Sequence, residues 1–185
     1  MYGLINKAVF EMVTTQFGDD VWEQIRSRAG IEEDLFLSMR QYPDEDTYRL
    51  VGAASAVLKL RPEHVLEAFG RYWVIYTARE GYGELLKISG RTIWEFLANL
   101  DNLHARVGLT FAGLRPPSFY CTDVTPRSLR LHYRSTRQGL SSLVMGLLKG
   151  VGDMFGTDVD VQLLSSGVAQ GGEDVFLVTQ QGPLA

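Results

Sequence analysis

The sequence has a single cysteine, Cys121, in 185 residues. One thiol excludes an internal disulfide and any zinc site that needs several cysteines. A signal peptide's basic start and long apolar stretch are also missing at the N-terminus. These absences predict a cytoplasmic protein in a reducing environment.

An excess of positive charge and long hydrophobic runs are lacking too. The net charge is −4 and the pI is about 5.4, which argues against nucleic acid as a partner. The longest apolar candidate, 140–148, is interrupted by serines and is too short to cross a membrane. A hydrophobic content of 45% with 22% charged residues is typical of a folded domain. We therefore expect one folded domain, without membrane insertion.

The first part of the chain predicts helices. Apolar residues recur at helical spacing, and glycines or prolines separate the segments. An apolar stripe runs from Ile93 to Val107, and the earlier helices are expected at about 4–13, 19–25, 32–39, 46–60 and 62–76.

The pattern changes at Arg115-Pro-Pro117, because two prolines in a row force an extended segment. The fold class is therefore α+β: a mainly helical region, 1–112, and an α/β region, 113–181, with a small antiparallel sheet, in a single domain 1–185. After the prolines, alternation predicts strands at 118–124, 128–137, 157–165 and 174–180, and a helix at 141–155.

The predicted strand 128–137 carries three polar side chains on its apolar face. Leu129 and Leu131 lead this face, and Tyr133, Ser135 and Arg137 follow. Side chains two positions apart on a strand share a face and are roughly 7 Å apart. Donors on a core-directed face are costly unless an acceptor binds them. An anion with several oxygens, such as a pair of carboxylates, would fit.

His104 lies on the apolar stripe, between Leu100 and Val107, so we expect it to point into the core. A histidine there is most often a core residue with a satisfied ring. Beside an anion-binding face in a helix-rich domain, a neutral imidazole is also what a porphyrin needs. The imidazole ligates iron, and the donors hold the two propionates.

Four separated motifs resemble the haem nitric oxide/oxygen binding (H-NOX) family, which is related to the haem domain of soluble guanylate cyclase. They are Met1-Tyr-Gly-Leu-Ile-Asn6, Leu100-Asp-Asn-Leu-His-Ala-Arg106, Arg115-Pro-Pro117 and Tyr133-x-Ser-x-Arg137. The last motif alone is weak, but the four agree in order across nearly the whole chain. The resemblance implies the H-NOX fold, with haem b (iron protoporphyrin IX) buried between the helical and the α/β regions.

The resemblance assigns His104 as the proximal iron ligand. It assigns Tyr133, Ser135 and Arg137 to propionate binding. Pro117 matches the proline that presses on the porphyrin and distorts it, although a proline there could also serve only to end the helical region.

On the distal side, the resemblance implies Trp73, Ile5 and Leu143 as pocket residues, although Trp73 fits a plain aromatic core equally well. Family members that hold oxygen look to have a tyrosine a few residues beyond the motif's arginine, which donates a hydrogen bond to the gas. Here no tyrosine occurs between Arg137 and Met145. We therefore predict a nitric oxide sensor that excludes oxygen, with carbon monoxide as a further candidate ligand.

The resemblance also implies how the signal leaves. Nitric oxide weakens the iron–histidine bond opposite it, and breaking that bond would free the helix that carries His104 and relax the haem against Pro117. Because the chain has no length left for an output domain, we predict signalling in trans, to a histidine kinase or a cyclic-di-GMP enzyme.

Two other classes of protein share part of this pattern. An enzyme would use Tyr133, His104 and Arg137 as acid–base groups, but no nucleophile–base pair or paired carboxylates occur at useful spacing. A haem peroxidase would need polar distal groups, so we predict no enzymatic activity. The stronger alternative is a binding module of the same fold that holds an apolar ligand or docks a partner without sensing a gas.

Overall fold

The computed structural model describes residues 1–111, 113–167 and 172–182. The chain divides into two compact units, Met1–Phe69 and Gly70–Ala185. Their boundary falls inside helix α4 (Pro62–Thr77). The change from helices to strands comes later, near the predicted position, so the second unit contains helices as well as the sheet.

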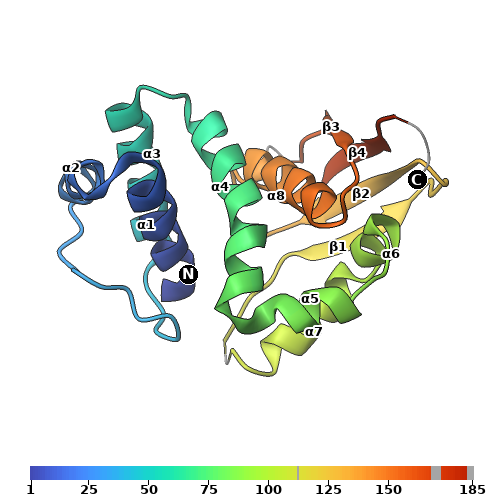
Figure 1. Cartoon of the computed structure of the whole chain (residues 1–185), viewed down its shortest axis with the longest axis horizontal. Helices are drawn as coiled ribbons and strands as arrows, with labels where there is room; N and C mark the ends of the chain where they lie inside the picture. Colours follow the sequence, from blue (N-terminus) through green and yellow to red (C-terminus); the bar gives the residue numbers. More distant parts are fainter. Residues whose placement is uncertain (112, 168–171, 183–185) are drawn as a thin grey trace. The chain divides into compact units, whose positions relative to one another are not determined.

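The first unit is built from α1 (Gly3–Phe17), α2 (Asp19–Ala29), α3 (Asp44–Leu58) and the first turns of α4 (Figure 1). These helices confirm four of the predicted segments. Gly30 ends α2 in the left-handed conformation, at φ 64°, which glycine adopts without steric cost. Pro62 opens α4, where its missing N–H is not needed.

The predicted helix at 32–39 is wrong, because this segment has no regular secondary structure. Its carbonyl groups serve α1 instead. The Ser38 and Arg40 carbonyls accept from the backbone N–H groups of Leu4 (3.1 Å) and Gly3 (2.8 Å). The segment therefore satisfies amide groups that the first turn of a helix leaves without partners.

In the second unit, α4 continues into a π-helical turn, η1 (Ala78–Tyr82), and then α5 (Gly83–Ile88). The predicted stripe from Ile93 to Val107 is not one helix but two, α6 (Ile93–Ala98) and α7 (Leu100–Gly108). Asn99 separates them, and its side-chain amide donates to the Ser89 carbonyl at 3.0 Å. Thr92 caps α6 by accepting from the Glu95 N–H.

Within the described residues, the sheet has four antiparallel strands in the order β1-β2-β4-β3. Helix α8 (Ser141–Met154) lies against one of its faces (Figure 1). The fully buried Leu129, Leu131, Phe176 and Val178 form the core of that face. The strands are β1 (Ser118–Thr122), β2 (Ser128–Arg134), β3 (Val159–Ser165) and β4 (Asp174–Gln180).

β2 ends three residues earlier than predicted. Ser135 Oγ accepts a hydrogen bond from the Arg137 N–H at 3.0 Å. Such a local turn competes with strand pairing, and the pairing of β2 with β4 already ends at Tyr133 and Asp174. Tyr133 is therefore on the buried face as predicted, whereas Ser135 and Arg137 lie in the loop that follows.

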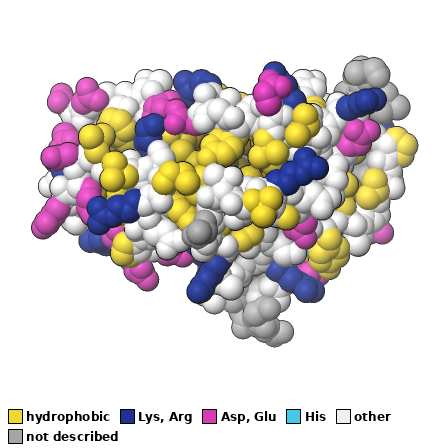
Figure 2. All heavy atoms as spheres, turned by 90° about the horizontal axis from the view of Figure 1, so that it is seen from below, with side chains coloured by type: hydrophobic (Ala, Val, Ile, Leu, Met, Phe, Trp, Pro, Cys, Tyr) yellow, Lys and Arg dark blue, Asp and Glu magenta, His cyan; other side chains and the backbone are white. Residues whose placement is uncertain are grey.

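The surface carries charges of both signs. Figure 2 shows acidic and basic side chains interspersed around exposed hydrophobic ones on the face drawn. Among the residues that the structure describes, no helix is both long and apolar enough to cross a membrane.

Candidate functional site

His104 projects from α7 into the second unit and is largely buried. Burial lowers the pKa of its imidazole, and the Asp101 carboxylate and the Pro117 carbonyl oppose that shift. Its buried Nδ1 atom makes no hydrogen bond of normal length and angle in the described part of the chain, although the Pro117 carbonyl lies close enough to the ring to raise its pKa. The ring is therefore a neutral imidazole with unsatisfied bonding capacity, the form in which histidine binds a metal.

Phe119, on β1, lies between His104 and Tyr133, the candidate iron ligand and the candidate propionate donor. Its ring stacks on His104 at 5.5 Å between centroids and contacts the Tyr133 ring at 5.3 Å. Phe119 and Tyr133 are also paired across the β1–β2 ladder. The structure thus brings together His104, Pro117 and Tyr133, which are distant in sequence.

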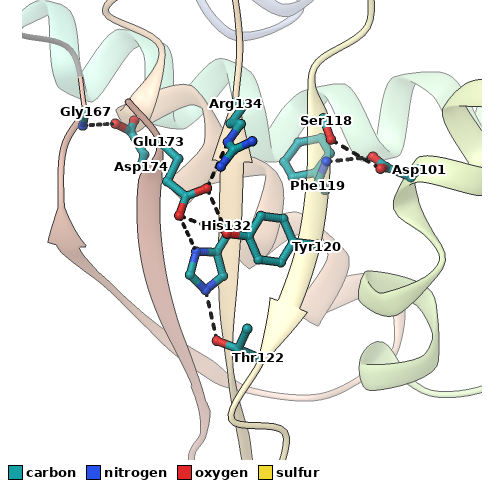
Figure 3. A network of polar contacts seen from close by, with 10 residues as sticks. All are labelled: Asp101, Ser118, Phe119, Tyr120, Thr122, His132, Arg134, Gly167, Glu173 and Asp174. Carbon is teal, nitrogen blue, oxygen red and sulfur yellow. Dashed lines mark hydrogen bonds and ion pairs between the residues drawn. The ribbon is translucent and has the colours of Figure 1, made fainter. Parts of the chain in front are cut away.

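Asp101, one turn before His104 on α7, ties this helix to β1. Its carboxylate accepts from the Phe119 N–H at 2.6 Å and from the Ser118 hydroxyl at 3.3 Å (Figure 3). These bonds to an ionised acceptor are stronger than those between neutral groups. The helix that carries His104 is therefore fixed to the strand that carries Phe119.

The anion-binding candidates lie beyond Phe119. Burial raises the pKa of the Tyr133 phenol, while Ser135 and Arg137 oppose that rise, so the phenol keeps its proton and can donate. The Arg137 guanidinium donates from Nη1 to the Arg115 carbonyl at 3.0 Å. This bond ties the loop after β2 to the segment that leads into Pro117.

The three residues predicted to line the distal pocket lie on three different helices. Trp73 lies on α4, where its ring stacks on the fully buried Tyr76 at 5.9 Å. Leu143 lies on α8, and α4 approaches α8 closely at Gly70, where a Cβ atom would be 2.2 Å from the Leu143 carbonyl oxygen. Ile5 belongs to the first unit, on α1. Their distal roles stay predictions.

Sequence reasoning missed three residues of this region. Nothing in the sequence marks Phe119 or Asp101 as part of the site, because a phenylalanine on a strand and an aspartate near a helix start are common. Asp174 was placed at a strand start without a role, yet it is only 6% exposed and accepts from the Ser141 hydroxyl at 2.6 Å and the Gly167 N–H at 2.9 Å.

The donor set fits a haem. A neutral buried imidazole could supply a nitrogen ligand to iron, and a phenol, a hydroxyl and a guanidinium could supply donors for propionate oxygens. The ring contacts of Phe119 and the bond from Arg137 to the Arg115 carbonyl link these groups within one unit.

H-NOX proteins are among the solved structures that share this architecture. An H-NOX protein from S. oneidensis in the Fe(II)NO ligation state matches with a TM-score of 0.88 and 18% identity, over 98% of this chain and 100% of that one. An unliganded Fe(II) H-NOX protein from K. algicida matches with a TM-score of 0.87 and 21% identity, over 100% of this chain and 99% of that one. At these identities the similarity establishes the H-NOX fold.

The sequence comparison establishes the family. The family model described as Haem-NO-binding matches residues 2–163. The chain is 35% identical over 173 residues to soluble guanylate cyclase gcy-32 of Caenorhabditis elegans, covering 92% of this chain and 25% of that protein. For soluble guanylate cyclase 89Da of Drosophila melanogaster the identity is 25%, over 90% of this chain and 25% of that protein. The chain belongs to the H-NOX (Haem-NO-binding) family, and it spans about a quarter of the length of these curated relatives.

Proposed function

We propose that this chain is a haem-based gas sensor that binds nitric oxide at a ferrous haem b held by His104. The observation that carries the proposal is the buried, neutral His104, which has an unpaired ring nitrogen and stacks on Phe119 beside Tyr133. Membership of the Haem-NO-binding family supports it.

Each group of residues has a separate task. His104 would supply the nitrogen ligand to the iron, and Tyr133, Ser135 and Arg137 would hold the propionates by hydrogen bonds. Pro117, whose carbonyl lies near the His104 ring, would contact the porphyrin. When bound, the haem iron would supply the coordination position for a diatomic gas.

The choice of gas depends on hydrogen-bond donors near the distal position. A bound oxygen molecule carries partial negative charge and is stabilised by a donor, whereas nitric oxide does not need one. No tyrosine occurs in 138–145, and the Ser141 hydroxyl there already donates to Asp174. We infer a preference for nitric oxide over oxygen, with carbon monoxide as a weaker ligand.

The signal is expected to leave through α7. This helix carries His104 and is tied to β1 by Asp101, so a change in the bond to His104 would alter the α7–β1 contact. We propose an effector enzyme as the recipient, a histidine kinase or a cyclic-di-GMP enzyme in trans. The similarity to guanylate cyclases supports a nucleotide-linked output as well.

The test is absorption spectroscopy of the reduced, haem-loaded protein. Adding nitric oxide should shift the Soret band, and exposure to oxygen without nitric oxide should produce no stable oxygen complex. If a stable oxygen complex forms, the gas assignment is wrong, and Tyr76→Phe then tests the buried phenol beside Trp73 as the donor. If protein supplied with haem stays colourless, the binding module without gas sensing is the better account.

A further inference from the structure

Two consecutive acidic residues, Glu173 and Asp174, lie where β4 begins, and their side chains point to opposite faces of the sheet (Figure 3). Asp174 is on the buried face, paired with Tyr133 across the β2–β4 ladder. Glu173, with a side chain 24% exposed, is on the outer face.

On the outer face, Glu173 accepts from one side chain of β1 and from two side chains of β2, the strand next to β4. The Tyr120 hydroxyl lies 2.9 Å from each of its oxygens, and His132 Nδ1 and Arg134 Nε lie at 3.0 Å. The Tyr120 and His132 rings stack at 4.3 Å, nearly parallel. These bonds lower the pKa of the Glu173 carboxyl, with the Tyr120 hydroxyl as the largest cause.

On the buried face, Asp174 holds the start of α8. It accepts from the hydroxyl of Ser141, the first residue of that helix, at 2.6 Å. It also accepts from the Gly167 N–H at 2.9 Å. Because Asp174 is almost completely buried, losing a donor would leave its carboxylate poorly solvated.

Glu173 and Asp174 therefore bind the residues on either side of one loop, 135–140. Residues 135–140 connect β2 to α8 and contain Ser135 and Arg137. Arg134 immediately precedes this loop and is bound by Glu173, and Ser141 immediately follows it and is bound by Asp174. The backbone pairing of β2 with β4 ends at Tyr133, so these side-chain bonds are what link β4 to both ends of the loop.

We propose that Glu173 and Asp174 are positioning residues that set the span of the loop 135–140 and thereby aim Ser135 and Arg137 at the propionates. This inference rests on the proposed haem site. In this proposal neither acid binds the propionates directly, and they act through Arg134 and Ser141. Groups that orient the direct ligands of a cofactor commonly change its retention by about tenfold or more when they are removed.

The experiment measures the rate at which haem leaves the loaded protein for an apomyoglobin acceptor. Glu173→Gln and Ser141→Ala should each speed haem loss about tenfold. Asp160→Asn is the matched control, because Asp160 accepts from Gln162 at 2.7 Å on β3, away from the loop. The control should stay within about twofold of the unmodified protein.

A second cofactor separates positioning from general weakening of the fold. With the dimethyl ester of haem, the propionates carry no charge, so Glu173→Gln should no longer change the rate of loss relative to the unmodified protein. Equal acceleration with both cofactors, or none with haem, overturns the inference. If the unmodified protein takes up no haem, the proposed function fails first, and the inference fails with it.

Discussion

At His104, burial and charge act on the imidazole pKa in opposite directions. Burial lowers it and is the larger effect, while the Asp101 carboxylate raises it. The phenol of Tyr133 shows the complementary case, because burial raises its pKa and keeps it protonated. Both groups are therefore neutral near pH 7: the imidazole offers a lone pair, and the phenol offers a proton.

At the residue scale, Arg137 can be tested against Arg130. Arg137→Ala removes a planar donor from the predicted propionate site and should weaken haem binding by about 2 kcal/mol, or about 30-fold. Arg130 lies on the outer face of β2 and pairs with Asp123 at 3.1 Å, with its side chain half exposed. Arg130→Ala should change haem affinity less than about twofold. Equal losses in the two variants would contradict the assignment of Arg137.

Cys121 offers a second test at this scale, because it is the one thiol in the sequence. Burial raises its pKa from 9.0 to about 11. At pH 8 the thiolate should be about 100-fold scarcer than for an ordinary cysteine, and reaction with Ellman's reagent should be slower by about that factor. The reaction in denaturant is the control, and a native rate equal to the denatured rate would show that the thiol is exposed.

At the element scale, sequence periodicity predicted most of the helices and the four strands that the structure describes. It failed where hydrogen bonds to distant parts of the chain decide the local structure. The segment 31–43 was expected to contain a helix, but its carbonyls are used by the start of α1. One stripe suggested one helix from Ile93 to Val107, because apolar spacing continues across Asn99. Such interruptions depend on tertiary hydrogen bonds, which a single sequence does not encode locally.

The packing of α4 on α8 gives a prediction for a pair of glycines. A Cβ atom at Gly70 would lie 2.2 Å from the Leu143 carbonyl oxygen, whereas one at Gly52, in α3, meets nothing within 4 Å. Gly70→Ala should lower the free energy of unfolding by about 2 kcal/mol. Gly52→Ala should raise it by about 1 kcal/mol, because alanine favours a helix. Urea unfolding measures both, and a Gly70→Ala protein as stable as the unmodified one would contradict the close packing.

At the scale of the whole molecule, seven of the eight predicted site residues lie in the second unit, and Ile5 lies in the first. The sequence predicted Tyr133, Ser135 and Arg137 as one strand face, and the structure keeps Tyr133 on the strand but places the other two in a loop. Only the fold shows that Glu173 and Asp174 border this loop, because they lie more than 30 residues away in sequence.

The central claim is that His104 is the axial ligand of a haem, and the ferrous absorption spectrum of His104→Gly tests it most directly. His104 sits on a helix that Asp101 also fixes, so the variant should keep its fold. Without added imidazole, it should lose the ferrous spectrum of the unmodified protein and its response to nitric oxide. Imidazole in the vacated space should restore the ferrous spectrum, but not the signal that leaves through α7, because free imidazole is not attached to this helix. A variant that shows the unmodified spectrum and the same nitric oxide response without imidazole would contradict the account.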